Sequence, residues 1–257
     1  MTTHEIEHIL SICRDAGSAI LEIYNSDDFN IEIKGDGSPL TRADKKSHEI
    51  IAEGLKNTDF PILSEEGKSI AFEERNKWNE FWMIDPIDGT KEFIKRNGDF
   101  TINIALIKNN NPVFGIVYVP VDNTVYLGDA EHGSYKFDIN DEDWKNKKNT
   151  LPFKIEREYT VVASRSHLSV ETEDFIEELK TDNPNLEIKS RGSSLKLCMV
   201  AEGLADIYPR FAPTMEWDTA AGHAVCSFAG KRVFEYNKTT ELVYNKENLL
   251  NPWFIVK

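Results

Sequence analysis

The segment Trp82–Phe93 constrains the fold most, because an apolar strand there runs directly into two aspartates and a Gly-Thr turn. Phe81–Ile84 has the composition of a buried strand, and Pro86 is expected to end its ladder because proline lacks an N–H donor. Asp85 and Asp88 therefore lie at the carboxyl end of a strand, where open sheets tend to place their ligands.

A short helix is predicted to follow the Gly89 turn, over Thr90–Ile94, with its free N–H groups facing the two aspartates. Carboxylates bind hard divalent cations, and a helix N-terminus favours phosphate. The segment therefore suits a metal-bridged phosphate ester. An ordinary strand-to-helix turn is the alternative interpretation, because Asp, Pro and Gly are common turn residues. This segment alone does not separate the two.

Composition limits the classes of protein that fit. The chain has 257 residues and a formal net charge of −14, from 30 Lys+Arg against 44 Asp+Glu, which repels polynucleotides and leaves small anions that bind through cations as candidate ligands. Three scattered cysteines show no disulfide or zinc spacing. No apolar run approaches the length of a membrane span, and the N-terminus lacks a signal sequence. We expect a soluble cytoplasmic protein with no nucleic-acid partner.

Hydrophobic periodicity predicts a mixed chain of helices and strands. Helices are expected over 6–24, 42–56, 171–180, 194–202 and 219–228, and strands over 31–33, 61–63, 81–84, 101–106, 113–119, 124–127, 161–163, near 188 and over 207–208. The middle strands read as an antiparallel meander, and Asp138–Lys148 as an exposed connector. A boundary near residue 155 is predicted, with an N-terminal lobe, 1–155, that carries the metal-binding motifs and a C-terminal lobe, 156–257, that completes the metal and nucleotide site.

Other acidic residues are placed where they can join the two aspartates. Glu65 and Glu66 follow a strand, Asp44 lies in the first turn of a helix, and Asp218 opens a helical segment. Magnesium prefers oxygen ligands, and two metals about 4 Å apart can clamp the attacking and leaving oxygens of a phosphoryl displacement. Taken singly, Asp218 could instead be a helix N-cap and Asp44 a partner of the helix dipole.

Together these motifs resemble the magnesium-dependent, lithium-sensitive phosphatases of the inositol monophosphatase superfamily, along nearly the whole chain. The resemblance rests on Leu63-Ser64-Glu65-Glu66, Asp85-Pro86-Ile87-Asp88-Gly89-Thr90 and Trp217-Asp218-Thr219-Ala220-Ala221-Gly222. Further segments are similar to the bacterial CysQ-type 3'(2'),5'-bisphosphate nucleotidases: Thr90–Gly98, Ser164–His167, Gly192–Lys196 and Tyr208–Phe211. Lys91-Glu92 departs from the Thr-Asn-Phe continuation more usual in inositol monophosphatases.

The resemblance implies roles for individual residues. One magnesium would be held by Glu65, Asp85 and the carbonyl of Ile87, and a second by Asp85, Asp88 and Asp218. Asp44 and the Thr90 hydroxyl would orient the attacking water, with Glu66 as a further acidic group, and Gly89 and Thr90 would bind the phosphate being removed. The same comparison implies His167, Ser193, Lys196 and Arg210 as nucleotide contacts. From the residues alone, Ser193-Ser194 could simply cap a helix and Arg210 could be an ion-pair partner.

The resemblance also implies a fold and a reaction. The fold is a layered α+β and α/β sandwich with alternating α-β-α-β-α layers. The reaction is hydrolysis of the 3'-phosphate of adenosine 3',5'-bisphosphate to AMP with two or more Mg²⁺ ions, in sulfur assimilation, and the sulfated analogue is a candidate second substrate. Inositol monophosphatase or fructose-1,6-bisphosphatase activity, or a silent metal- or nucleotide-binding regulator, are the alternatives. Relatives imply peripheral association with the cytoplasmic face of the inner membrane, which no basic amphipathic helix supports. The sequence leaves the oligomeric state open.

Overall fold

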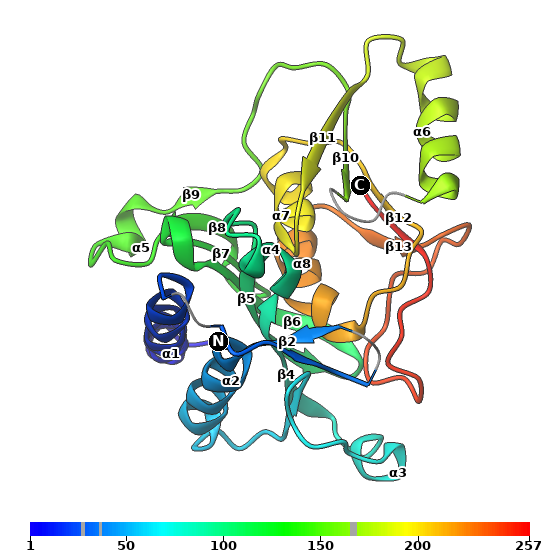
Figure 1. Ribbon diagram of the computed structural model, residues 1–257. Helices are drawn as coiled ribbons and strands as arrows, with labels where there is room; N and C mark the ends of the chain where they lie inside the picture. The colour runs from blue at the N-terminus through cyan, green and yellow to red at the C-terminus, as the bar shows by residue number, and fades with distance from the viewer. Residues whose placement is uncertain (27–28, 36–37, 165–168) are drawn as a thin grey trace.

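A seven-stranded sheet forms the centre of the computed structural model, which describes residues 1–26, 29–35, 38–164 and 169–257 (Figure 1). Its order is β3-β4-β5-β6-β7-β8-β9; β3 and β4 are parallel, and the other neighbours are antiparallel. The strands are β3 (Ile62–Ser64), β4 (Glu80–Asp88), β5 (Thr101–Lys108), β6 (Asn111–Val119), β7 (Thr124–Asp129), β8 (Gly133–Asp138) and β9 (Asn149–Thr150).

Helices cover both faces of this sheet, and alternation along the strands explains why. On β4, Trp82 and Ile84 pack with α1 and α2, whereas Phe81 and Met83 pack with α7 and α8. Successive side chains of a strand point to opposite faces, so a strand with apolar residues at every position needs a helical layer on each side. The helices are α1 (Thr3–Tyr24), α2 (Arg42–Leu55), α7 (Leu195–Glu202) and α8 (Glu216–Phe228).

Two small sheets and a further helix lie beyond α7 and α8. Parallel strands β10 (Thr160–Ser164) and β11 (Glu187–Arg191) form one sheet, and β12 (Tyr208–Arg210), β14 (Phe254–Val256) and β13 (Val233–Glu235) form the other. Helix α6 (Val170–Asp182) packs Ile176 against β10. The predicted α-β-α-β-α layering is therefore confirmed. Short elements complete the chain: β1 (Glu32–Ile33), β2 (Pro39–Leu40), α3 (Phe72–Arg75), α4 (Thr90–Ile94), η1 (Pro120–Asp122) and α5 (Trp144–Lys147).

Three local expectations need correction. Pro86 does not end β4: pairing continues from Asp85 to Asp88 across a register shift, so the proline lies in a bulge. The connector 138–148 contains the short helix α5, and Trp144 is buried there because its ring stacks on Phe137. Helix α8 begins three residues earlier than predicted, at Glu216.

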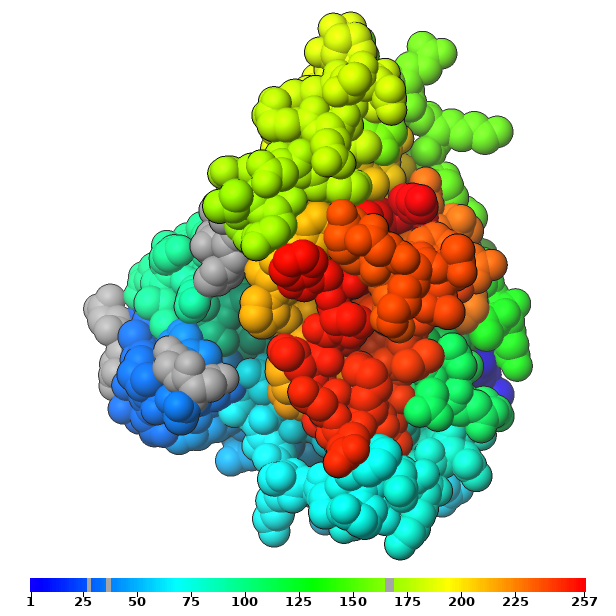
Figure 2. Space-filling view, turned by 90° about the vertical axis from the view of Figure 1, so that its right-hand side faces the viewer, coloured from blue at the N-terminus to red at the C-terminus, as the bar shows by residue number. Residues whose placement is uncertain are grey.

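The C-terminal residues run along one face of the molecule and meet the segment that contains α3 (Figure 2). The large sheet lies within residues 62–150 and the small sheets within 160–256, but a division into lobes at residue 155 stays a prediction. In the described part of the chain, no helix is long and apolar enough to span a membrane.

Candidate active site

The first acidic group stands at the carboxyl end of β3. The parallel pairing of β3 with β4 continues one residue beyond the strand, since the Glu65 N–H donates to the Ile84 carbonyl at 3.1 Å. Lys34 places its ammonium group between Glu65, at 2.7 Å, and Glu66. Sequence reasoning did not include Lys34. A cation thus bridges the two glutamates that the sequence predicted to lie at or near a metal.

The bulge in β4 turns the next ligand candidates into the interior. Asp85 is buried, and its Oδ1 accepts the Ile87 N–H at 3.1 Å. Ser47 of α2 donates to the Pro86 carbonyl at 2.8 Å and holds the bulge against the helix. Burial raises the pKa of Asp85 well above its usual range, and the nearby carboxylates of Glu65, Asp88 and Asp218 raise it further.

Asp88 is surrounded by polar groups from two other segments. Its Oδ2 lies 2.9 Å from the Ser194 hydroxyl and accepts a weak hydrogen bond from Asn103 Nδ2 at 3.4 Å. Burial raises the pKa of Asp88, an effect that the positive charge of Lys196 opposes. Asn103 was not predicted; its signal was a polar residue between the apolar residues Ile102 and Ile104 of β5.

Asp218 reaches the same cluster from α8. It is the third residue of that helix, and its Oδ2 accepts the Met215 N–H at 2.9 Å, so Met215, and not Asp218, is the N-cap residue. Ser194 lies 2.8 Å from the backbone carbonyl of Asp218 and connects it to Asp88. Burial raises the pKa of Asp218 well above its usual range, and the Asp88 and Glu65 carboxylates add to the rise.

The predicted water-orienting pair is in contact. Asp44 Oδ1 accepts the Thr90 hydroxyl at 3.0 Å, while Asp44 Oδ2 accepts the Thr41 N–H at 2.7 Å and the Thr41 hydroxyl at 2.5 Å. Thr41 is the N-cap of α2, so one carboxylate both closes the capping box of a helix and holds Thr90. Burial raises the pKa of Asp44.

Gly89 opens α4 in the left-handed region, with φ +95°. A Cβ at this position would lie 2.9 Å from the Asp99 carbonyl oxygen and 3.2 Å from Ser193 Cβ. Both the backbone conformation and the close approach therefore require glycine. The turn brings Gly89, Thr90, Lys91 and Glu92 to the cavity that Glu65, Asp88 and Asp218 also line.

Cations from the C-terminal half line this cavity as well. Lys196 is buried and donates to the Ser193 carbonyl at 2.6 Å; burial lowers the pKa of Lys196 to about 8, although the Asp88 carboxylate opposes that shift. Arg210 is close enough to lower the Lys196 pKa further, and its Nη2 donates to the Pro213 carbonyl at 3.0 Å. His167, the remaining predicted nucleotide contact, lies outside the described residues.

The cavity has a volume of about 260 Å³. Many predicted residues line it: Glu65, Asp88, Gly89, Thr90, Ser193, Lys196, Arg210 and Asp218. Asp44, Glu66, Asp85 and Ile87 are not among the lining residues. Asp44 contacts the lining residue Thr90, and Glu66 shares Lys34 with the lining residue Glu65. The lining also includes Ser164, Thr214, Thr219 and Phe254, which sequence reasoning did not assign to the site.

A second acidic group lies at the C-terminal end of β7. Ligand atoms of Asp129, Glu131 and His132 fall within 4.8 Å of one another. The Met1 amino group, however, lies 3.1 Å from Asp129 and 3.3 Å from Glu131, and His132 Nδ1 lies 2.6 Å from Asp129. The Met1 ammonium group already compensates part of the carboxylate charge, so no role in phosphate chemistry is assigned to this group.

Comparison with known proteins identifies the family. The model of the inositol monophosphatase family matches residues 2–253. The 3'(2'),5'-bisphosphate nucleotidase CysQ of Escherichia coli K12 is 41% identical over 254 residues, which is 98% of each chain. The Salmonella typhimurium protein of the same name is 42% identical over 254 residues, with the same coverage.

Solved structures give the same result. The crystal structure of CysQ from Bacteroides thetaiotaomicron, described as a bacterial member of the inositol monophosphatase family, superposes with a TM-score of 0.92 at 48% identity and covers 100% of this chain and 98% of its own. An inositol monophosphatase of Thermotoga maritima shares the fold, with a TM-score of 0.77 at 22% identity over 99% of this chain and 92% of its own. The family match, the identity to these relatives and the shared fold together show that this chain belongs to the inositol monophosphatase family.

Proposed function

We propose that this protein is a magnesium-dependent 3'(2'),5'-bisphosphate nucleotidase. It removes the 3'-phosphate of adenosine 3',5'-bisphosphate to give AMP and phosphate, in sulfur assimilation, and accepts the sulfated analogue as a second substrate. Support comes from relatives that carry this name at 41–42% identity. The three cysteines are free and buried, which agrees with a reducing cytoplasm.

One observation carries the choice of substrate. Lys196 and Arg210 line the same cavity as Glu65, Asp88 and Asp218, and the two cations lie close enough to repel each other. Burial and Arg210 together lower the pKa of Lys196 in spite of the Asp88 carboxylate, so an anion that contacts both cations would be favourable. A substrate with one phosphate at the carboxylates and a second at these cations satisfies both halves of the cavity, and a bisphosphorylated nucleotide is such a substrate.

The acidic half fits divalent metal. Glu65, Asp85, Asp88 and Asp218 are largely buried. Burial raises the pKa of Asp85 and of Asp218, and the neighbouring carboxylates raise both further, as expected for clustered carboxylates that a cation would stabilise. We assign Glu65, Asp85 and the Ile87 carbonyl to one Mg²⁺, and Asp85, Asp88 and Asp218 to a second. When bound, the metal supplies Lewis-acid stabilisation of the phosphoryl oxygens and lowers the pKa of water.

The protein's own side chains and N–H groups orient the attacking water and bind the substrate. Asp44 accepts a hydrogen bond from the Thr90 hydroxyl. The lone pairs of the Thr90 oxygen are then free to accept a hydrogen bond from the attacking water. We assign the N–H groups of Gly89 and Thr90, two residues that line the cavity, to the phosphate that is removed. Ser193 and Lys196 hold the nucleotide end, with Arg210 beside them, and Glu66 remains an additional acidic group near Lys34.

Phosphate release tests this assignment. Adenosine 3',5'-bisphosphate, inositol 1-phosphate and fructose 1,6-bisphosphate are supplied in parallel at equal concentration, with Mg²⁺, with EDTA, and with Mg²⁺ plus Li⁺. We expect Mg²⁺-dependent hydrolysis with the highest kcat/KM for the nucleotide, and inhibition by Li⁺ as a competitor for one cation position.

The alternatives give different results. Preference for inositol 1-phosphate or fructose 1,6-bisphosphate would move the chain to another branch of the family. Binding of the nucleotide or of the metal without turnover of any substrate would indicate a silent regulator. Preparations with and without EDTA treatment control for metal carried through purification.

A further inference from the structure

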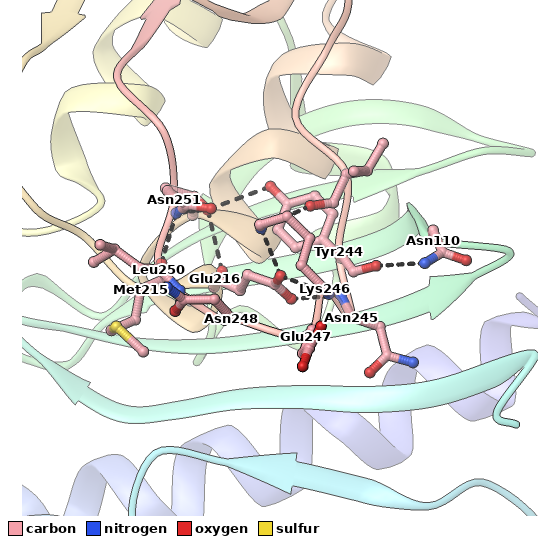
Figure 3. Close-up of polar contacts among 12 residues, drawn as sticks. Asn110, Met215, Glu216, Tyr244, Asn245, Lys246, Glu247, Asn248, Leu250 and Asn251 are labelled. Atoms are coloured by element: carbon pink, nitrogen blue, oxygen red, sulfur yellow. Dashed lines mark hydrogen bonds and ion pairs between the residues drawn. The ribbon is translucent and has the colours of Figure 1, made fainter. Parts of the chain in front are cut away.

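The start of helix α8 rests on a buried carboxylate. Glu216 is the first residue of the helix, and its side chain has no solvent exposure. Its oxygens accept the Asn245 N–H at 2.5 Å, the Lys246 N–H at 3.0 Å and the Lys246 ammonium at 2.5 Å (Figure 3). Three donors from one segment compensate the buried charge, so the contact is specific to that segment.

The same segment, residues 244–251, which we call the C-terminal strap, also holds the turn before the helix. Asn251 is buried, and its Nδ2 donates to the Met215 carbonyl at 2.8 Å and lies 3.0 Å from the Thr219 hydroxyl. In the other direction, the Glu216 N–H donates to the Leu249 carbonyl at 2.9 Å. Met215 is the residue whose N–H binds Asp218. Asn251 is thus connected to Asp218, the predicted metal ligand, through hydrogen bonds to a single intervening residue, Met215.

The N-terminal part of the strap, residues 245–247, is fixed to α3, which follows Glu65 in the chain. Arg75 of α3 is buried and donates to the Asn245 side chain at 2.9 Å and to the Lys246 and Glu247 carbonyls at 2.6 and 2.7 Å. Asn245 Nδ2 returns a hydrogen bond to the Arg75 carbonyl at 2.7 Å. Figure 2 shows the C-terminal segment meeting the α3 segment at the surface.

We propose that Glu216 and Asn251 are positioning residues for metal binding. They tie the start of α8, and with it Asp218, through the strap to α3, which follows Glu65 in the chain. The proposal rests on the metal-binding role assigned above to these two carboxylates. Residues that hold a metal ligand in place commonly change metal affinity by 10- to 100-fold when they are replaced.

The experiment measures metal binding directly. Glu216→Gln, which keeps the size of the side chain, and Asn251→Ala are compared with the wild type by titration of the EDTA-treated protein with Mn²⁺, where the electron paramagnetic resonance signal of free Mn²⁺ reports the unbound ion. Ile9→Ala is the control, because Ile9 is a core residue of α1 and makes no contact with the strap. Thermal melts of all four proteins fix a working temperature at which each is folded.

We expect Mn²⁺ affinity about 10-fold weaker in both strap variants and unchanged in Ile9→Ala, even where the control lowers the melting temperature as much. Wild-type affinity in both strap variants would overturn the proposal, as would an equal loss in the control. If Glu216→Gln does not fold, Asn251→Ala alone decides. A wild type that binds Mn²⁺ but hydrolyses no nucleotide would remove the proposed function and leave this inference standing, whereas a wild type without Mn²⁺ affinity would overturn both.

Discussion

At the scale of single residues, the two cavity residues Lys196 and Thr90 have different surroundings. Lys196 is buried beside Arg210 and Asp88, and among the described residues its ammonium group donates one hydrogen bond, to the Ser193 carbonyl. The donors that remain on the ammonium group can bind a phosphate oxygen. Thr90, by contrast, acts through the direction of one hydroxyl, which Asp44 fixes. The two residues therefore make different kinds of contribution, one to substrate binding and one to the chemical step.

Lys196→Gln should weaken transition-state binding of adenosine 3',5'-bisphosphate. A charge-assisted hydrogen bond to phosphate is worth about 1.5–3 kcal/mol, which corresponds to roughly a 10- to 150-fold loss in kcat/KM. Hydrolysis of inositol 1-phosphate, which has no second phosphate, should change much less. Lys238→Gln is the matched control, because that lysine is exposed and paired with Glu235. Equal losses on both substrates would argue against a nucleotide role for Lys196.

Thr90→Val should lower kcat by about 100-fold, the scale of a lost proton-transfer or orienting group. Valine keeps the shape of threonine but cannot donate to Asp44. Thr90→Ser retains the hydroxyl and should stay within a few-fold of the wild type. Steady-state kinetics at saturating Mg²⁺ measure both variants, and equal activities for the two would show that the hydroxyl has no part in the chemical step.

At the scale of elements, α8 is placed by the sheet below it as well as by the strap. Gly115 of β6 and Gly128 of β7 face the helix, and a Cβ at Gly115 would lie 2.5 Å from the Ala221 carbonyl oxygen. On the face of α8 that packs on the sheet, the residues next to these glycines include the small residues Ala221 and Ala224. Because the backbone approaches so closely, the sheet fixes the depth of α8 while the strap fixes its N-terminal end.

Gly115→Ala should destabilise the fold by about 1–3 kcal/mol, since the added methyl group meets helix backbone that cannot yield as a flexible side chain would. Urea unfolding followed by circular dichroism measures the change. Gly35→Ala is the control, because a Cβ there meets no atom of the described residues within 4 Å, so its free energy of unfolding should shift by no more than about 0.5 kcal/mol. Similar losses for the two variants would show that close packing at Gly115 is not the cause.

At the scale of the whole molecule, patterns that repeat along the chain were predictable and contacts between distant segments were not. Apolar periodicity gave the long helices and the meander, and the position of Thr41 gave the start of α2 together with the first-turn place of Asp44. Neither Lys34, which bridges Glu65 and Glu66, nor Asn103, which supports Asp88, belongs to a local motif. The strap was missed for the same reason, since Glu216 meets Lys246 only after the chain has folded.

The clustered carboxylates of the cavity also make the stability of the whole molecule depend on both metal and pH. In the metal-free protein, Asp85, Asp88 and Asp218 have raised pKa values, so their stabilisation is complete below the usual carboxyl pKa, near 3.8, and is lost as pH rises through the higher folded values. His223 and Glu241 have lowered pKa values and act in the opposite direction, with stability lost as pH falls. These two do not depend on metal.

The difference between the melting temperature in Mg²⁺ and that in EDTA isolates the carboxylates, because His223 and Glu241 contribute equally to both melts. We expect this difference to be small at pH 5 and to grow toward pH 8, since metal ligands must be deprotonated and Mg²⁺ then relieves the repulsion among them. Asp218→Asn should flatten the increase, because it removes one ligand and one repelling charge. A difference independent of pH in the wild type would show that the clustered carboxylates are not what the metal binds.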